Sequence, residues 1–134
     1  MDNDCIFCKI IKGEIPSYKV YEDDNVMAFL DVKPVNPGHT LVVPKEHYHN
    51  LENIPEEILL DVIKAVKKVG NSIKANLAPG YNVNLNNDPV AGQEIPHTHF
   101  HVIPRNPEDH LRLWPKREYL DGEPEKILAM IKIN

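Results

Sequence analysis

The chain has 134 residues, of which 42% are hydrophobic, and a formal net charge of −5 at pH 7. This length and content fit one compact domain with its own core. The negative charge argues against a protein that holds nucleic acid on a broad basic surface, although local phosphate binding stays open. We find no stretch of the ~20 apolar residues that span a membrane and no signal peptide, so we expect a cytoplasmic protein without a membrane partner.

Periodicity and turn residues predict a short N-terminal helix followed by β-strands. The helical turn covers residues 6–11 and ends near Gly13 and Pro16. Three β-rich runs follow it, at residues 18–21, 26–31 and 39–43. The first two runs are joined by an acidic turn and predict an antiparallel hairpin, and Pro44 closes the third.

The longest periodic segment predicts an amphipathic helix. It begins after Asn53 with Pro55 near its first turn, and it ends before Pro79. Strands follow at residues 81–85 and 97–103, with a loop between them. An antiparallel meander of about five strands, with one long helix and short N- and C-terminal helices, is an α+β fold.

The C-terminal tail, residues 106–134, shows weaker patterns. Prolines interrupt residues 105–122, which we expect to be mostly irregular, before a short helix at 125–131. Trp114 is expected to pack this tail against the body or against a partner subunit. Because no linker divides the chain, residues 1–105 and the tail are expected to form a single domain.

Cys5 and Cys8 are the two cysteines of the chain. Their spacing is too short for a disulfide that would stabilise the fold, but it suits the binding of one metal ion or a redox-active pair. A redox pair usually begins a helix after a βαβ strand, which this N-terminal position does not supply. A metal site is therefore preferred to a disulfide, and two free buried thiols are the alternative.

His97, His99 and His101 alternate with apolar or β-branched residues. In a strand, alternate side chains share one face at intervals of about 6.6 Å. The three imidazoles are therefore expected to line one wall, where they would meet an anion, a metal or a reaction. The weaker alternative is that the three histidines have only a structural role.

The run HTHFHVIPR resembles the histidine-triad (HIT) motif, in which histidine and mostly apolar residues alternate. The N-terminal segment of the Hint-like and bacterial branches is similar to CIFCKIIKGEIPSYKVYEDD, and their central segment to FLDVKPVNPGHTLVVPKEH. Their active-site segment is similar to AGQEIPHTHFHVIPR. The resemblance reaches Arg105 and implies the HIT-like fold.

This resemblance implies a hydrolase or transferase that attacks the α-phosphorus of purine nucleotide conjugates through a covalent nucleotidyl-histidine. His99 would be the nucleophile, because neutral imidazole is nucleophilic and its phosphoramidate bond is labile to water. His39 and His101 would stabilise the phosphate. Gly92 and Gln93, on the preceding loop, would contact it as well.

The resemblance also implies how the nucleoside is recognised. Asp31 would accept hydrogen bonds from both ribose hydroxyls, and Asn86 would reach the ribose and phosphate. The base would lie in an apolar pocket, formed by Ile6, Phe7, Ile10, Phe29 and Val32. Without the resemblance, we would interpret these apolar residues as ordinary residues of the hydrophobic core.

Glu94 departs from the family pattern, in which serine or threonine follows the glutamine and assists the leaving group. A carboxylate there would repel phosphate if it pointed inward, or donate a proton if its pKa were raised. The preferred leaving group, whether amine, phosphate or a second nucleotide, therefore stays open.

Zinc-bearing family members combine the Cys-x-x-Cys pair with two histidines, one of which begins the triad. The resemblance thus implies a zinc site of Cys5, Cys8, His47 and His97, with His49 as a substitute for His47. Such a Cys₂His₂ set is a closed structural site, which would tie the N-terminal turn to the active-site segment.

The resemblance further implies a homodimer, paired through the long helix and the strand near residues 81–85, which would remove an exposed sheet edge. Two functions remain. The first is an enzyme acting on nucleoside phosphoramidates, adenylylated amines or dinucleoside polyphosphates, and the second is a non-catalytic nucleotide-binding interaction protein. The intact His99 and its supporting histidines favour the enzyme.

Overall fold

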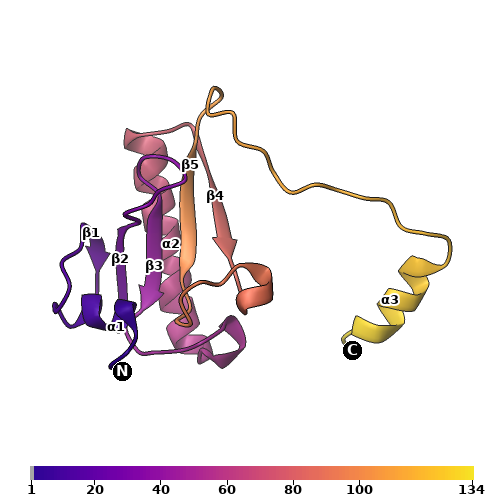
Figure 1. The fold of residues 1–134 in the computed structure, drawn as a ribbon, viewed down its shortest axis with the longest axis horizontal. Helices are drawn as coiled ribbons and strands as arrows, with labels where there is room; N and C mark the ends of the chain where they lie inside the picture. The colour runs from indigo at the N-terminus through magenta and orange to yellow at the C-terminus, as the bar shows by residue number, and fades with distance from the viewer. Residues whose placement is uncertain (1) are drawn as a thin grey trace.

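The computed structural model describes residues 2–134, whose strands form a five-stranded antiparallel sheet (Figure 1). The strands are β1 (Lys19–Glu22), β2 (Val26–Leu30), β3 (Thr40–Pro44), β4 (Gly80–Leu85) and β5 (Phe100–Arg105). Their order across the sheet is β1-β2-β3-β5-β4, so β1 and β4 are its edges. The predicted α+β meander is confirmed.

Three α-helices and two short 3₁₀ turns complete the described elements. They are α1 (Ile6–Ile11), α2 (Glu56–Asn76), α3 (Glu123–Ile131), η1 (Leu51–Asn53) and η2 (Pro89–Ala91). α2 has the predicted extent, with Glu56 and Glu57 in its first turn, where negative charge favours a helix N-terminus. Within residues 2–134 no helix combines the length and the apolar character needed to cross a membrane.

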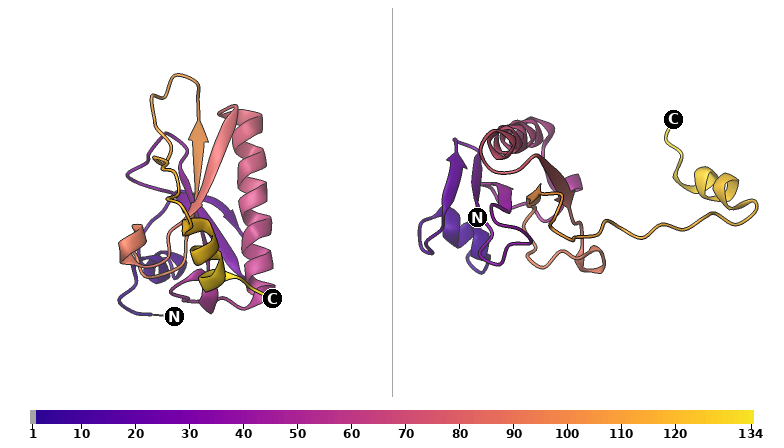
Figure 2. Two further views of the ribbon diagram at one scale, coloured as in Figure 1. Left: turned by 90° about the vertical axis from the view of Figure 1, so that its right-hand side faces the viewer. Right: turned by 90° about the horizontal axis from the view of Figure 1, so that it is seen from above.

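The central strands of the sheet are buried on both faces, with α2 on one side and α1 on the other (Figure 2). In β5, Phe100 and Val102 pack into the cluster beneath α2. Phe29 and Leu41, from β2 and β3, pack into the second cluster with the residues of α1. Because side chains alternate along a strand, His101 projects onto the α1 face, which carries the site described below.

β5 begins at Phe100, so the prediction of a strand from residue 97 is wrong for its first three residues. The pairing of β3 with β5 stops at Val42 opposite Phe100. Pro44, which follows on β3, has no N–H to donate to a longer ladder. The amide of Thr98 instead donates to the carbonyl of Tyr48, at 2.7 Å. His97 and His99 are therefore held by loop contacts.

The tail leaves the sheet after β5 and leads to α3 away from the body (Figure 1). Residues 106–122 contain no helix or strand, as predicted, whereas Arg105 belongs to β5. Trp114 is 80% exposed, so the expected packing against the body is absent from the single chain. Its packing against a partner subunit stays a prediction.

Replacing Val42 by alanine should lower the free energy of unfolding by about 2 kcal/mol, because the lost methyl groups leave a cavity in a core position with 0% exposure. Urea denaturation followed by circular dichroism measures the change. Val90→Ala is the matched control, since Val90 is 97% exposed and should change stability by less than about 0.5 kcal/mol. Equal losses in the two variants would contradict this description of the core.

Candidate active site

Three histidines from different segments meet on the α1 face of the sheet. His39 directly precedes β3, His99 directly precedes β5, and His101 lies within β5. The ring centroids of His99 and His101 are 4.9 Å apart, and those of His39 and His101 are 5.1 Å apart. The structure thus brings together His99, the expected nucleophile, and its two expected phosphate contacts, His39 and His101, whereas His97, also expected to take part in catalysis, faces the neighbouring cysteines.

Backbone groups determine which nitrogen of each ring carries the proton. The N–H of Val35 donates to Nδ1 of His39 at 3.0 Å, so in the neutral ring the proton of His39 is on Nε2. Nε2 of His39 lies 2.9 Å from Nδ1 of His101 and donates to it, which leaves the proton of His101 on Nε2. Nδ1 of His99 lies 2.7 Å from the carbonyl oxygen of His97, which only accepts. We therefore assign the proton of His99 to Nδ1 and an unprotonated lone pair to Nε2.

Burial keeps these rings neutral at pH 7. Desolvation lowers the pKa of His101 to about 4, and the nearby His99 and His39 act in the same direction. Desolvation also lowers the pKa of His99 and of His39. The charges of Asp31 and Glu94 oppose this shift at His99 but do not reverse it. An unprotonated nucleophile is therefore available without a separate base.

Asp31 lies at the end of β2, beside His39. One of its carboxylate oxygens accepts from the amide of Lys33 at 2.9 Å, and the other lies 3.8 Å from Nε2 of His39. The side chain is only partly buried, so it remains accessible to a ligand at the edge of the histidine cluster. Asp31 could therefore accept hydrogen bonds from hydroxyl groups of a ligand that also contacts the histidines.

The loop before His99 is held by Gln93, which is 6% exposed. Its side-chain amide donates to the carbonyl of His49 at 2.8 Å, and its side-chain oxygen accepts from the amide of Asp88 at 2.8 Å. Gln93 therefore positions the loop, and both ends of its side chain are already engaged. Gly92 has a φ of +94°, a conformation that favours glycine, and its carbonyl accepts from Asn86 at 3.4 Å.

The apolar residues assigned to the base pocket divide into two groups. Phe7 and Phe29 are buried with their ring centroids 5.6 Å apart, and Ile10 packs against the same cluster. Ile6 and Val32 are 43% and 79% exposed and lie outside that cluster. The ring of Phe7 also contacts His99 edge-on, with centroids 5.0 Å apart. Phe7 thus places an apolar wall directly beside the proposed nucleophile.

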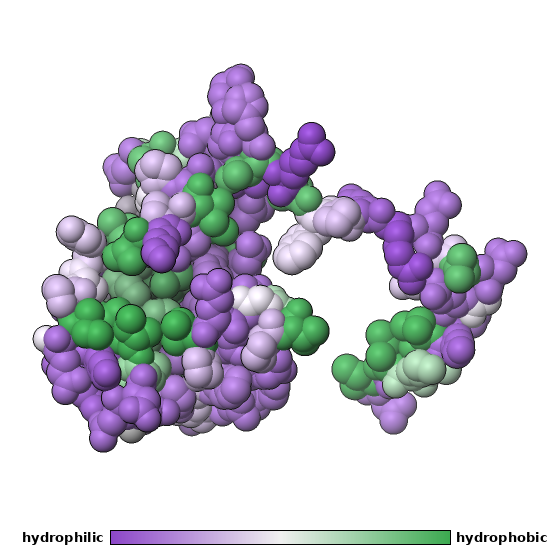
Figure 3. Space-filling view, viewed as in Figure 1, coloured by the Kyte–Doolittle hydropathy of each residue, from purple (hydrophilic) through white to green (hydrophobic). Residues whose placement is uncertain are grey.

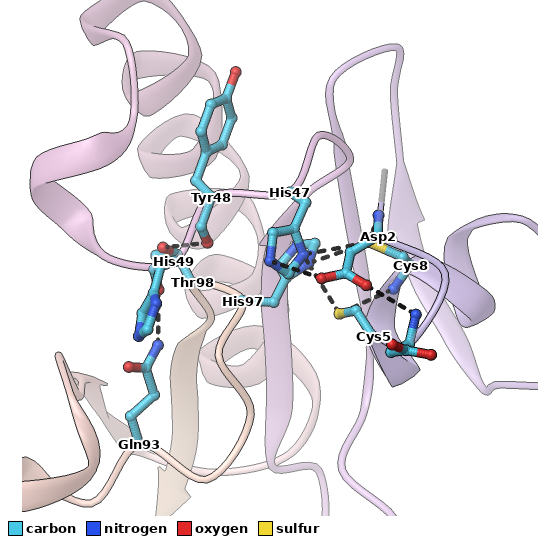
Figure 4. Close-up of polar contacts among 10 residues, drawn as sticks. Asp2, Cys5, Cys8, His47, Tyr48, His49, Gln93, His97 and Thr98 are labelled. Carbon is cyan, nitrogen blue, oxygen red and sulfur yellow. Dashed lines mark hydrogen bonds and ion pairs between the residues drawn. The ribbon is translucent and has the colours of Figure 1, made fainter.

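Two thiols and two imidazoles, from Cys5, Cys8, His47 and His97, converge next to the cluster of His39, His99 and His101. Figure 4 shows these four side chains. Nδ1 of His97 lies 3.4 Å from Sγ of Cys5, 3.6 Å from Sγ of Cys8 and 3.2 Å from Nδ1 of His47, and Sγ of Cys8 lies 3.5 Å from Nδ1 of His47. Tetrahedral Zn²⁺ with ordinary bond lengths separates a sulfur and a nitrogen ligand by about 3.6 Å, and two nitrogen ligands by about 3.3 Å. The donor set therefore fits a zinc ion, and His49 is not part of it.

His97 links this cluster to His99 and is itself held by Pro44, using a different atom for each contact. Its Nε2 lies 2.9 Å from the carbonyl oxygen of Pro44 and donates to it, which leaves the Nδ1 lone pair directed at the thiols. Its own carbonyl accepts from His99. The side chain is fully buried, and desolvation lowers its pKa to about 4. Both ring nitrogens of the first histidine of the row are therefore engaged, one by Pro44 and the other by the Cys/His cluster.

The sequence did not identify several groups that support the site. Asp2 lies 3.8 Å from Nε2 of His47, and its amide donates to Sγ of Cys8 at 3.4 Å. The carbonyl of Pro44 and the amide of Val35 fix two imidazoles. These contacts are made mostly by backbone atoms, which leave no signal in side-chain identity.

Comparison with known families places these residues in context. The model of the HIT domain matches residues 12–108, which is more than half of the chain. The chain belongs to the HIT family. It also carries the N-terminal Cys-x-x-Cys pair, as Cys5 and Cys8.

Curated HIT relatives match most of the chain. An uncharacterised HIT-like protein of Methanocaldococcus jannaschii is 56% identical over 101 residues, covering 75% of this chain and 78% of that protein. The adenosine 5′-monophosphoramidase of Candida albicans is 47% identical over 109 residues, covering 78% and 72%. The adenylylsulfatase of Arabidopsis thaliana is 45% identical over 139 residues, covering 98% and 70%.

Solved HIT structures share the fold. A HIT family protein of Bacillus subtilis superposes with a TM-score of 0.86 at 39% identity, covering 96% of this chain and 94% of that one. A histidine triad family protein of Mycobacterium smegmatis, described as zinc-bound, superposes with a TM-score of 0.78 at 33% identity, covering 93% and 89%. The predicted HIT-like fold is confirmed.

Lowering the pH from 7 should leave the ring of His101 neutral until about pH 4, because burial disfavours the imidazolium. Nitrogen-15 NMR titration of the labelled chain measures the midpoint, and at pH 7 it should show His99 protonated at Nδ1 and His39 at Nε2. The chain unfolded in urea is the control, since unperturbed histidines titrate near 6.5. A folded-state midpoint of His101 near 6.5 would contradict the assignment.

Proposed function

We propose that the protein is a hydrolase or transferase of purine nucleotide conjugates that attacks their α-phosphorus and releases a nucleoside monophosphate. The observation that carries this proposal is the unprotonated Nε2 of His99, whose other nitrogen donates to the carbonyl of His97 at 2.7 Å. The phosphoramidase and adenylylsulfatase activities named for two relatives support it, because both activities break a bond at an adenylyl phosphorus.

In the first step, the lone pair of His99 Nε2 forms a bond to the α-phosphorus, and the bond from phosphorus to the leaving group breaks with its electron pair on that group. An amine leaving group takes up a proton from solvent water as it departs. The Nε2–H of His101 donates to a phosphate oxygen, where negative charge develops. In the second step, water attacks the phosphorus, the N–P bond returns its electrons to Nε2, and the water proton goes to solvent.

The nucleoside is proposed to lie over β2 and β3. Asp31 accepts from the ribose hydroxyls, and Asn86 and Gly92 approach the ribose and phosphate from the opposite loop. The base packs against Phe7, Phe29 and Ile10 within an apolar pocket, whose rim is formed by Ile6 and Val32. Gln93 acts as a positioning residue in this proposal, because both ends of its side chain hold the loop backbone.

Zn²⁺ is the proposed occupant of the cluster of Cys5, Cys8, His47 and His97. The ion would neutralise the two thiolates and fix the four side chains in one geometry. His97 would hold the ion through Nδ1 while its carbonyl continues to orient His99. The proposed role is therefore structural, and the ion would not contact the reacting phosphate, which would lie at His39, His99 and His101.

A homodimer is also proposed. β4 pairs on one side with β5 and is an edge of the sheet, which exposes a row of backbone groups unless a second copy covers it. Tyr81 on β4 packs against Gly70 of α2, so these two elements form one continuous surface. We propose that residues 1–105 form the catalytic body and that residues 106–134 belong to the same domain.

Mixing the chain with adenosine 5′-phosphoramidate should add the mass of one adenylyl group, because the covalent intermediate lies on the reaction path. Intact-mass spectrometry after rapid acid quenching measures the adduct, and peptide mapping should place it on His99. His99→Ala should show no adduct and should lose at least about a thousandfold in rate, as expected for a nucleophile whose removal eliminates the covalent path.

His110→Ala is the control, since this exposed histidine lies outside the cluster. If the unaltered chain binds AMP yet forms no adduct and releases no AMP from the phosphoramidate, the enzymatic function is excluded. The chain would then be a non-catalytic nucleotide-binding protein.

Cys5→Ser and His47→Ala should each reduce bound zinc from about one ion per chain to a small fraction, because each removes one of four ligands from a closed site. Elemental analysis after gel filtration measures the metal content. His49→Ala is the matched control and should keep the ion, since His49 is not in the donor set. Retention of zinc by Cys5→Ser would exclude this site.

A further inference from the structure

A pocket of about 280 Å³ opens beside the Cys/His cluster and has no role in the reaction proposed above. The N-terminal segment, His47 and the loop before His97 form its walls, which include Asp2, Asp4, Cys5, Ile6 and Ile95. Hydrophilic side chains gather at this end of the body, near the N-terminus (lower left in Figure 3). A water molecule takes up about 30 Å³ of liquid, so the pocket has room for a small polar reagent beside the thiol of Cys5.

The two thiols differ in their access to this pocket. Cys5 lines it and is 6% exposed, whereas Cys8 is fully buried and does not line it. The amide of Cys8 donates to Sγ of Cys5 at 3.4 Å, and the two Sγ atoms lie within 4.8 Å of each other. A reagent that enters the pocket would therefore meet Cys5 first, with Cys8 close enough to react with the product.

The backbone around the two thiols allows a disulfide to form by a local rearrangement. Cys5 directly precedes α1 and has extended torsions, with φ −80° and ψ 123°, whereas Cys8 lies in the first turn of α1. Side chains three positions apart in a helix have Cβ atoms about 5–6 Å apart, and a disulfide requires about 3.5–4.5 Å. Because Cys5 lies outside the regular helix, the closure falls on its own torsions and on the first turn of α1.

A disulfide would remove two of the four proposed zinc ligands. Zn²⁺ is bound by thiolate sulfur, and a sulfur that has formed a disulfide no longer carries the charge that holds the ion. Only the two imidazoles of His47 and His97 would remain, and two neutral ligands do not make a closed site. Oxidation of the thiols and loss of the ion are therefore one linked event.

The first turn of α1 also contacts the segment that carries His99. Phe7 lies between the two cysteines in the sequence, and its ring centroid is 5.0 Å from that of His99 and 5.7 Å from that of His97. Nδ1 of His97 faces both thiols, and the carbonyl of the same residue accepts from His99. Closing the disulfide would thus move the apolar wall beside His99 and remove one restraint on His97.

We propose that Cys5 and Cys8 form a peroxide-sensitive modification site, whose oxidation to a disulfide expels the metal ion and lowers the activity of His99. The effect on activity rests on the function proposed above, whereas the chemistry at the thiols does not. This site makes the alternative of a redox pair, which the cysteine spacing also suits, a second state of the proposed metal site.

The reaction with hydrogen peroxide has two steps. The sulfur of Cys5 attacks one peroxide oxygen, the O–O bond breaks, and the departing hydroxide takes up a proton to give water, which leaves Cys5 as a sulfenic acid. The sulfur of Cys8 then attacks the sulfur of Cys5, the S–O bond breaks, and the second hydroxide also becomes water. The two sulfurs lose two electrons in total, and the peroxide gains them. A dithiol reductant reverses the oxidation.

Treating the zinc-loaded chain with hydrogen peroxide should release about one zinc ion per chain, together with a loss of about 2 Da from the polypeptide. A coloured chelator measures the released ion, and peptide mapping by mass spectrometry should show a disulfide between Cys5 and Cys8. Dithiothreitol followed by zinc should restore both the thiols and the metal content. Met130, which is 68% exposed, is the internal control, because its sulfoxide shows that the peroxide dose was sufficient.

Retention of zinc and of both thiols in a chain whose Met130 is oxidised would overturn the proposal, and the cluster would then be an inert structural site. A disulfide between two chains, or a sulfinic acid without a disulfide, would overturn it as well.

The order of attack tests the role of the pocket. With the metal removed and both thiols reduced, limiting iodoacetamide should label Cys5 at least about tenfold more than Cys8, because Cys5 lines the pocket. In the same way, dimedone should trap a sulfenic acid on Cys5 in Cys8→Ser and little on Cys8 in Cys5→Ser. The chain unfolded in urea is the control, in which both thiols should react equally. Equal labelling in the folded chain would contradict the pocket route.

The link to His99 has its own measurement. The oxidised chain should lose about tenfold or more in kcat/KM for adenosine phosphoramidate, as expected when the groups that support a reacting residue are disturbed, and dithiothreitol with zinc should restore it. An unchanged kcat/KM in the fully oxidised chain would overturn this link. A chain without any phosphoramidase activity contradicts the proposed function, but zinc release and the mass change still decide whether the thiols are the modification site.

Discussion

The hydrogen bond from Nδ1 of His99 to the carbonyl of His97 is the contact on which the site depends. It directs the lone pair of His99 outward, and it requires that the carbonyl of His97 stay in place. That carbonyl is fixed because the ring of the same residue donates to Pro44 and faces two thiols. One residue thus transmits the geometry of the Cys/His cluster to the nucleophile, as second-layer hydrogen bonds commonly do.

Burial of the sheet on both faces explains why four imidazoles act as neutral groups. An imidazolium in these buried positions loses its hydration, so protonation is disfavoured for each ring. Neutral rings have one donor and one acceptor, and the chain from Val35 through His39 to His101 uses both in a fixed direction. The same burial therefore leaves an unprotonated Nε2 at His99, the proposed nucleophile, and an Nε2–H donor at His101, although the two residues are of the same type.

The sequence predicted most of the fold because its signals are local. The stripe of α2, the turn residues between β1 and β2, and Pro44 at the end of β3 each act through neighbouring residues. The set of Cys5, Cys8, His47 and His97 followed from family resemblance, and the structure brings those ligand atoms together. The start of β5 was not predictable in this way, since it depends on the missing N–H of Pro44 on another strand. The orientation of Gln93 depends on the backbone of residues 49 and 88, which no spacing rule reveals.

The two ends of the chain lie on opposite sides of the histidine cluster. α1 brings Cys5, Phe7 and Cys8 against the segment that holds the nucleophile, so changes there alter the reacting group itself. The tail contacts the sheet chiefly near Arg105 and borders a groove lined by residues of β4, β5 and the tail itself. Because loops and tails vary more freely than a buried core, substitutions in the tail are expected to leave the arrangement of His39, His99 and His101 intact.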